Sequence, residues 1–179
     1  MWRVENGRPF CRVGMVDRDV ACAFTALAQR AVQMASFADS AVDSIYRMDS
    51  EITKKNLQSM LFGLAMDSSW VFEDNPTARH NRYRDVIFAF ISSPRTLASE
   101  EVRKGYGMTD IFIPAKDGRR PVIIEVKTTI DKGTDLGTLA EEVLGQIEDR
   151  CYADEPDIAD AIRVGIGIRM KTVEVAFRG

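Results

Sequence analysis

The stretch RRPVIIEVKTTI, residues 119–130, constrains the fold more than any other part of the sequence. Its β-branched apolar residues predict a strand buried in a sheet. Glu125 and Lys127 interrupt that strand, and side chains two residues apart on a strand lie on the same face. The pattern therefore predicts a core strand that presents two charges on one side.

The residues before this strand predict a hairpin. TDIFIP, residues 109–114, is a second β-type run, and the intervening AKDGRR contains Asp-Gly, a turn signal. Asp110 begins the earlier run directly after GYGMT, in which two glycines allow a tight turn. Because a hairpin returns the chain, we expect Asp110 to reach Glu125 near the end of the sheet.

Helical periodicity predicts four helices. Asn75 is the expected N-cap of the third, with Pro76 at its first position, and Ser50 is the expected N-cap of the second. A capping box of Thr138 and Glu141 is expected to open the fourth. The predicted helices cover residues 17–32, 50–66, 75–91 and 138–152.

The third predicted helix has an apolar stripe that includes Tyr83 and Ile87, with Arg79, Arg82 and Arg84 away from the stripe or beside it. Further β-type runs are TLASEEV before the hairpin, and IRVGIGIRM and TVEVAF at the end of the chain. In TVEVAF, alternation predicts that the valines and the phenylalanine face inward, opposite Glu174 and Ala176. From residue 76 the predicted order is α-β-β-β-α-β-β.

Length and composition bound the class of protein. With 179 residues, 45% hydrophobic and 28% charged, we expect one soluble unit: an N-terminal helical segment, residues 1–70, packed on a core domain, residues 71–179. No membrane span or signal peptide is indicated, so we expect a cytoplasmic protein. Three scattered cysteines and a single histidine, His80, argue against a disulfide framework and a zinc site.

Charge is unevenly distributed along the chain. The net charge is −3, but residues 79–132 carry eleven Lys and Arg against seven Asp and Glu, while residues 133–161 carry one Arg against nine acids. The first segment is able to face phosphates and the second repels them. On charge alone, two differently solvated surfaces are the better explanation of this asymmetry.

The predicted cluster of Asp110, Glu125 and Lys127 has a chemical use. Mg²⁺ binds one or two carboxylates, keeps several waters and bridges to phosphate oxygens. A neighbouring ammonium can orient a metal-bound water and offset charge on a phosphodiester under attack. An isolated E-x-K in a strand is nevertheless far more often a surface ion pair, which contributes little.

The spacing D-x14-E-x-K, from Asp110 to Lys127, resembles the PD-(D/E)XK nuclease superfamily. The segments GYGMTDIFIP, PVIIEVKTT, LAEEVLGQIEDRCYA and IRVGIGIRMKTVEV resemble the nuclease-like domain found behind AAA-ATPase-like modules. Gln146 and Tyr152 match that family's helix motif. The resemblance covers residues 76–178 and implies an α/β fold with a restriction-endonuclease-like core, α-β-β-β-α-β, whose mixed central sheet is flanked by helices and preceded by N-terminal helices.

The resemblance implies a site and a cofactor. Mg²⁺ or Mn²⁺ would be held by Asp110, Glu125 and the carbonyl of Val126. Lys127 would activate water, and Gln146 would support the site or contact substrate. Without the resemblance, Gln146 is better explained as a solvated side chain beside the buried face of its helix.

Three features depart from the family pattern. Thr109 stands where the signature has proline, Met108 replaces an arginine, and His80 stands about where the family's first helix offers glutamate. The chain contains no G-x-x-x-x-G-K-[ST] motif, so an ATPase would be a separate partner.

Two functions follow from these features. The first is a metal-dependent nuclease that hydrolyses phosphodiester bonds, on DNA rather than RNA by preference. The alternative is an inactive nuclease-fold module that binds nucleic acid or regulates a protein partner, because a fold does not fix a function. The sequence is also compatible with a homodimer.

We also expect that Asp110 and Glu125 repel each other, so that removing either one leaves the protein stable.

Overall fold

A computed structural model of the chain describes residues 2–5, 8–11, 36–63, 75–92, 96–104, 107–149 and 158–179. The chain divides into two compact units, residues 1–33 and residues 34–179. In the first unit, β1 (Trp2–Glu5) and β2 (Arg8–Cys11) form an antiparallel pair. The helix predicted over residues 17–32 lies outside the described residues.

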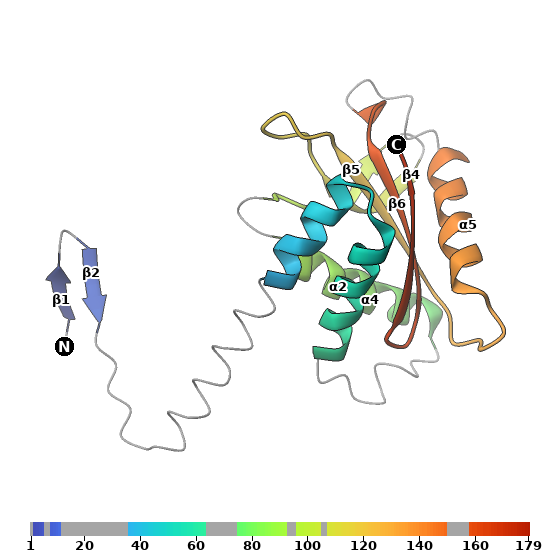
Figure 1. The fold of residues 1–179 in the computed structure, drawn as a ribbon, viewed down its shortest axis with the longest axis horizontal. Helices are drawn as coiled ribbons and strands as arrows, with labels where there is room; N and C mark the ends of the chain where they lie inside the picture. Colours follow the sequence, from blue (N-terminus) through green and yellow to red (C-terminus); the bar gives the residue numbers. More distant parts are fainter. Residues whose placement is uncertain are drawn as a thin grey trace, which may run out of the picture. The chain divides into compact units, whose positions relative to one another are not determined.

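The second unit is built on a five-stranded mixed sheet, drawn in Figure 1, with the order β3-β4-β5-β6-β7. Neighbouring strands are antiparallel except β5 and β6, which are parallel. The α/β class and the mixed sheet are confirmed, and from residue 76 the observed order of elements is the predicted one. The strands are β3 (Ser99–Lys104), β4 (Gly107–Ile113), β5 (Val122–Thr128), β6 (Ile162–Arg169) and β7 (Thr172–Arg178).

Helices cover both faces of this sheet (Figure 1). Helical residues 36–46, α2 (Ser50–Gly63) and α4 (Pro76–Ile91) pack on one face, where they share a core with β4 to β7. On the opposite face lies α5 (Leu136–Asp149), coloured orange in the figure. The periodicity described above does not predict the helical residues 36–46. None of the helices in the described part of the chain has the length and apolarity needed to cross a membrane.

Strand β5 is buried on both faces. Val122 and Ile124 belong to the core beneath α2 and α4, and Ile123 belongs to the core beneath α5. All three are 0% exposed. The same two-sided burial overturns one prediction on β7: Ala176 does not face solvent but packs in the α5 core, because α5 covers the face that alternation alone assigned to water.

The hairpin between β4 and β5 closes as the sequence predicts. Lys116 and Arg119 form an antiparallel bridge around Asp117 and Gly118. Both central residues have positive φ, 51° and 76°, which is the conformation of a type I′ turn. The turn sets the register, and Ile111 lies opposite Ile124.

The start of α4 is also confirmed. The Asn75 side chain accepts hydrogen bonds from the backbone N–H groups of Thr77 and Ala78, and Pro76 follows it. The stripe that includes Tyr83 and Ile87 is buried as predicted.

Two of the three arginines of α4 are buried, which the helical periodicity did not specify. Arg79 and Arg84 are buried, since partners on other elements satisfy their guanidinium groups. Arg79 donates to Thr128 Oγ1 on β5 at 3.3 Å, and Arg84 pairs with Glu101 on β3.

Two N-caps differ from those expected. The Oδ1 atom of Asp49 accepts the N–H of Ile52 at 3.0 Å, so Asp49 caps α2 and Ser50 lies inside the helix. Likewise Asp135 Oδ1 accepts the N–H of Thr138 at 2.7 Å. The capping box of Thr138 and Glu141 is therefore wrong: an aspartate three residues earlier takes the same role and begins α5 sooner.

The contact between β6 and α5 is unusually close. A Cβ atom at Gly165 would overlap the carbonyl oxygen of Ala140, and one at Gly167 would lie 2.7 Å from the carbonyl oxygen of Leu136. Both overlaps are with helix backbone, which has no flexible end to move aside. Glycine at these two positions therefore allows α5 to lie directly on the strand.

Gly165→Ala should lower the free energy of unfolding by about 1–3 kcal/mol or more, since the helix must move away from the strand. Gly145→Ala is the matched control: it lies within α5 with no atom within 4 Å of the added methyl group. This control should raise stability by about 0.5–1 kcal/mol. Urea unfolding of the two variants measures both effects, and a Gly165→Ala protein as stable as wild type would refute the close contact.

Candidate functional site

A cleft of about 530 Å³ opens at one end of β4 and β5. The residues that line it come from α4, β4, β5 and α5. All five residues predicted to form the site are among them: Asp110, Glu125, Val126, Lys127 and Gln146, together with His80, Gly107 and Met108.

The cleft begins where β4 separates from β5. The β4–β5 ladder ends at Ile111 and Ile124, so Asp110 and Glu125 are the first pair beyond it. On the other side, the β3–β4 ladder omits the pair of Glu101 and Asp110, and Glu101 has a φ of 48°. The backbone around Asp110 is therefore irregular on both sides of the strand.

The Asp110 side chain links β4 to β5 and to α4 at this point. Its Oδ2 atom accepts the backbone N–H of Val126 at 2.7 Å, a buried hydrogen bond that replaces a missing ladder contact. Its Oδ1 atom lies 3.1 Å from Nε2 of His80 on α4. The hydrogen bond to Asp110 raises the pKa of His80 and outweighs the burial of the ring, which lowers it. The imidazole of His80 therefore pairs with the Asp110 carboxylate at the cleft.

Both predicted carboxylates are buried, with exposed fractions of 9% for Asp110 and 6% for Glu125. Removing a carboxylate from water is costly unless hydrogen bonds or a cation compensate for the lost solvation. The fold places both groups in the lining of one cleft, Asp110 from β4 and Glu125 from β5. Such an arrangement has a ready use as the binding site of a cation.

Lys127 follows on the same face of β5 and is half-exposed. Its Nζ atom lies 3.1 Å from Oε2 of Glu142 on α5, and the exposed fractions of the two side chains are 41% and 54%. Gln146, one turn further along α5, also lines the cleft. The helix therefore supplies one wall of the cleft, and β5 supplies its floor.

The donor set fits a hard divalent cation only in part. Among the described residues, no group of three or more His, Cys, Asp and Glu side chains is arranged to hold a metal ion. Mg²⁺, however, requires only one or two carboxylates and completes its shell with water. Asp110 already uses one oxygen for Val126 N–H and the other for His80, and each oxygen retains a second lone pair.

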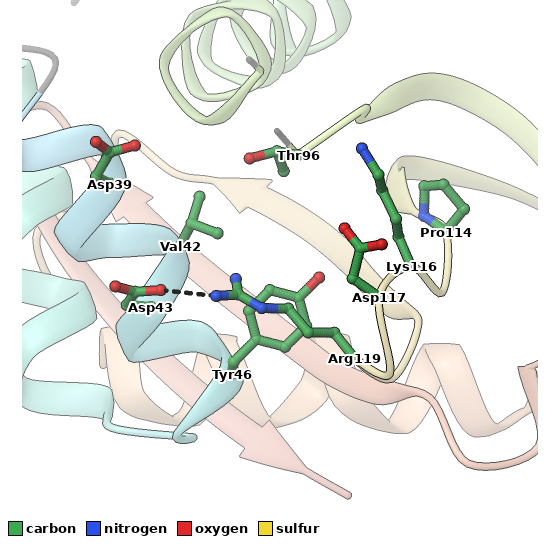
Figure 2. Close-up of a pocket in the computed structure, with 9 residues that line it drawn as sticks. All are labelled: Asp39, Val42, Asp43, Tyr46, Thr96, Pro114, Lys116, Asp117 and Arg119. Atoms are coloured by element: carbon green, nitrogen blue, oxygen red, sulfur yellow. Dashed lines mark hydrogen bonds and ion pairs between the residues drawn. The ribbon is translucent and has the colours of Figure 1, made fainter. Parts of the chain in front are cut away.

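A second cavity, of about 620 Å³, lies beside the β4–β5 turn and contains none of the predicted site residues. Figure 2 shows the Arg119 guanidinium stacked on the ring of Tyr46, 4.7 Å from its centroid, and paired with Asp43 at 3.4 Å. Side chains of both charge signs surround this cavity, and here charge is partly neutralised within the wall. The first cleft, where buried carboxylates converge, has the stronger chemical signature.

His80 lines the cleft but is not among the site residues that the sequence predicts. Its partner, Asp110, lies thirty positions away on another element, so local periodicity carries no signal for the contact. The one available signal was the match of His80 to the position of a glutamate in the first helix of the nuclease-like family. Tyr152, the other helix residue of that resemblance, lies outside the described residues.

Comparison of the chain with protein-family models, with curated proteins and with solved structures found no match. The resemblance to PD-(D/E)XK nucleases therefore rests on the residues themselves and on their spacing.

The contacts of Asp110 change one expectation about stability. Because Asp110 accepts a buried N–H, Asp110→Ala leaves that donor unsatisfied, and we expect a loss of about 1–3 kcal/mol in the free energy of unfolding. Asp110→Asn, which retains an oxygen acceptor, should lose less. Denaturant unfolding in the absence of divalent metal measures both variants. An Asp110→Ala protein more stable than wild type would instead support simple repulsion between the carboxylates.

Proposed function

We propose that this protein is a metal-dependent nuclease that hydrolyses phosphodiester bonds in nucleic acid, with DNA as the preferred substrate. The observation that carries the proposal is the convergence of Asp110, Glu125 and Lys127 in one cleft, at the point where β4 separates from β5. An ordinary surface ion pair between Glu125 and Lys127 does not explain two buried carboxylates there.

Each residue has a role that follows from its position. Asp110 and Glu125 would hold Mg²⁺ or Mn²⁺ together with the carbonyl oxygen of Val126, and the ion would supply Lewis acidity and an activated water. Lys127 keeps its ammonium at the rim, where it can offset negative charge on a phosphate under attack. Gln146 faces the same cleft and is placed to orient water or substrate.

The order of the elements and the charge of the cleft walls support the proposal. The observed order from α4 to β6 is α-β-β-β-α-β, the order that the nuclease resemblance implies. In addition, the cationic segment of the chain, residues 79–132, includes α4, β4 and β5, which form most of the cleft. A phosphate backbone would approach from these elements rather than from the acidic α5.

One observation favours an alternative, an inactive nuclease-fold module that binds nucleic acid or regulates a partner. Both oxygens of Asp110 are engaged by the protein itself, through His80 and Val126. If these contacts persist in the presence of metal, Asp110 serves as a structural carboxylate and the cleft binds without cutting.

Metal binding is the first test. We expect the wild type to bind Mn²⁺ weakly, and Glu125→Gln to lose this binding because one of two carboxylate ligands becomes a neutral amide. Water proton relaxation during a Mn²⁺ titration measures the affinity. The control is Glu174→Gln, which removes a half-exposed carboxylate that pairs with Lys54 on α2, outside the cleft. Equal Mn²⁺ binding by all three proteins would contradict the assignment of Glu125.

Catalysis is the second test. With Mg²⁺ or Mn²⁺ present, wild type should cleave nucleic acid, and Lys127→Ala should reduce the rate by at least about 100-fold while retaining metal binding. The matched control is Lys54→Ala, because Lys54 is also a partly exposed lysine in an ion pair, at 2.7 Å from Glu174. Initial rates are compared on single- and double-stranded DNA and RNA.

Two results would contradict the nuclease proposal. Equal traces of cleavage by wild type, Lys127→Ala and Glu125→Gln would identify a contaminating enzyme. Absence of cleavage by wild type on every substrate, with Mn²⁺ binding intact, would favour the binding module.

A further inference from the structure

Lys127 and Glu142 form a contact that the proposed chemistry does not use. Lys127 comes from β5 and Glu142 from α5, and their Nζ and Oε2 atoms are 3.1 Å apart. Both side chains are long and half-exposed, so the contact contributes little to stability by itself. Lys127 lines the cleft, and Glu142 stands one helical turn before Gln146, which also lines it. The contact is therefore placed to affect the cleft rather than the stability of the fold.

The purpose follows from what Lys127 would otherwise contact. Lys127 and Glu125 are two residues apart on one strand face, a separation of about 6–7 Å along the strand. A lysine side chain is flexible enough to swing its ammonium back over that distance. An ammonium placed on Glu125 or Asp110 would compete directly with a metal ion for the same carboxylate oxygens.

We propose that Glu142 is a positioning residue: it holds the Lys127 ammonium on the α5 side of the cleft and so leaves the carboxylates of Asp110 and Glu125 available to a divalent cation. The inference rests on the proposed function and adds a residue to it. Glu142 touches neither the cation nor the substrate and acts through Lys127.

The position of Glu142 is itself fixed by the core. Helix α5 lies directly on β6 because Gly165 and Gly167 allow the helix backbone to approach. In the parallel register, Gly167 is the partner of Lys127 on β5. The same glycine that brings α5 close therefore lies beside the lysine that Glu142 contacts, which explains how two exposed side chains meet at a defined place.

The test is a double-mutant cycle with Mn²⁺ as the probe. In the wild-type background, Glu142→Gln should weaken Mn²⁺ binding by about two- to fivefold, the range expected for one exposed ion pair. In the Lys127→Ala background, the same substitution should leave Mn²⁺ affinity unchanged, because no ammonium remains to compete. Cleavage rates at saturating metal should also fall in Glu142→Gln, as Lys127 loses its fixed position.

The cycle distinguishes a positioning role of Glu142 from a direct electrostatic attraction between Glu142 and the cation. If Glu142 attracted the cation only through its negative charge, Glu142→Gln would weaken Mn²⁺ binding equally with and without Lys127, and the inference would be wrong. Glu148→Gln is the matched control, since Glu148 is another exposed carboxylate of α5 but pairs with Arg178 at 2.7 Å. This control should leave both Mn²⁺ affinity and cleavage unchanged. Thermal unfolding should detect no loss of stability in Glu142→Gln.

The outcomes also separate this inference from the proposed function. Wild type that binds Mn²⁺ and cleaves, with Glu142→Gln indistinguishable from it, would overturn the role of Glu142 alone. Wild type that neither binds Mn²⁺ nor cleaves would overturn the nuclease proposal and this inference with it.

Discussion

The contact of α5 with β6 is the constraint on which the second unit depends. At Gly165 and Gly167 the helix backbone lies against the strand with no side chain between them. This contact closes one face of the sheet and completes the second core around Ile123 and Leu144. It also determines how far the polar side of α5 stands from β5, and hence which helix residues reach the cleft.

At the cleft, the burial of two carboxylates opposes the stability of the fold. Two carboxylates at 9% and 6% exposure are unfavourable for folding unless they are compensated, and the protein provides a backbone N–H and a histidine for Asp110. A sheet that needed only stability would continue the pairing of β4 and β5 with apolar residues at these positions. Functional sites typically depart from the most stable local structure. Such departures are concentrated where ionisable groups converge.

Sequence reasoning predicted the hairpin and the convergence of its charges because both depend on local rules. The Asp-Gly turn sets the register, and the register places Asp110 opposite Glu125. Contacts between distant elements were not predictable in this way. The burial of Arg84 depends on a carboxylate from β3, and the pairing of Lys127 with Glu142 depends on the distance between a helix and a strand. The predicted N-caps of α2 and α5 were wrong for a different reason, because Asp49 and Asp135 stand near other residues that cap equally well.

The irregularity at Glu101 has a consequence for the outer edge of the sheet. Strand β3 is the edge strand next to β4, and an edge strand offers unpaired backbone groups on which another chain can add a strand. Glu101 breaks the extended conformation in the middle of β3, and Arg84 holds its carboxylate. A continuous edge-to-edge ladder with a second molecule is therefore blocked. The irregularity in β3 opposite Asp110 therefore disfavours association of two molecules through this edge.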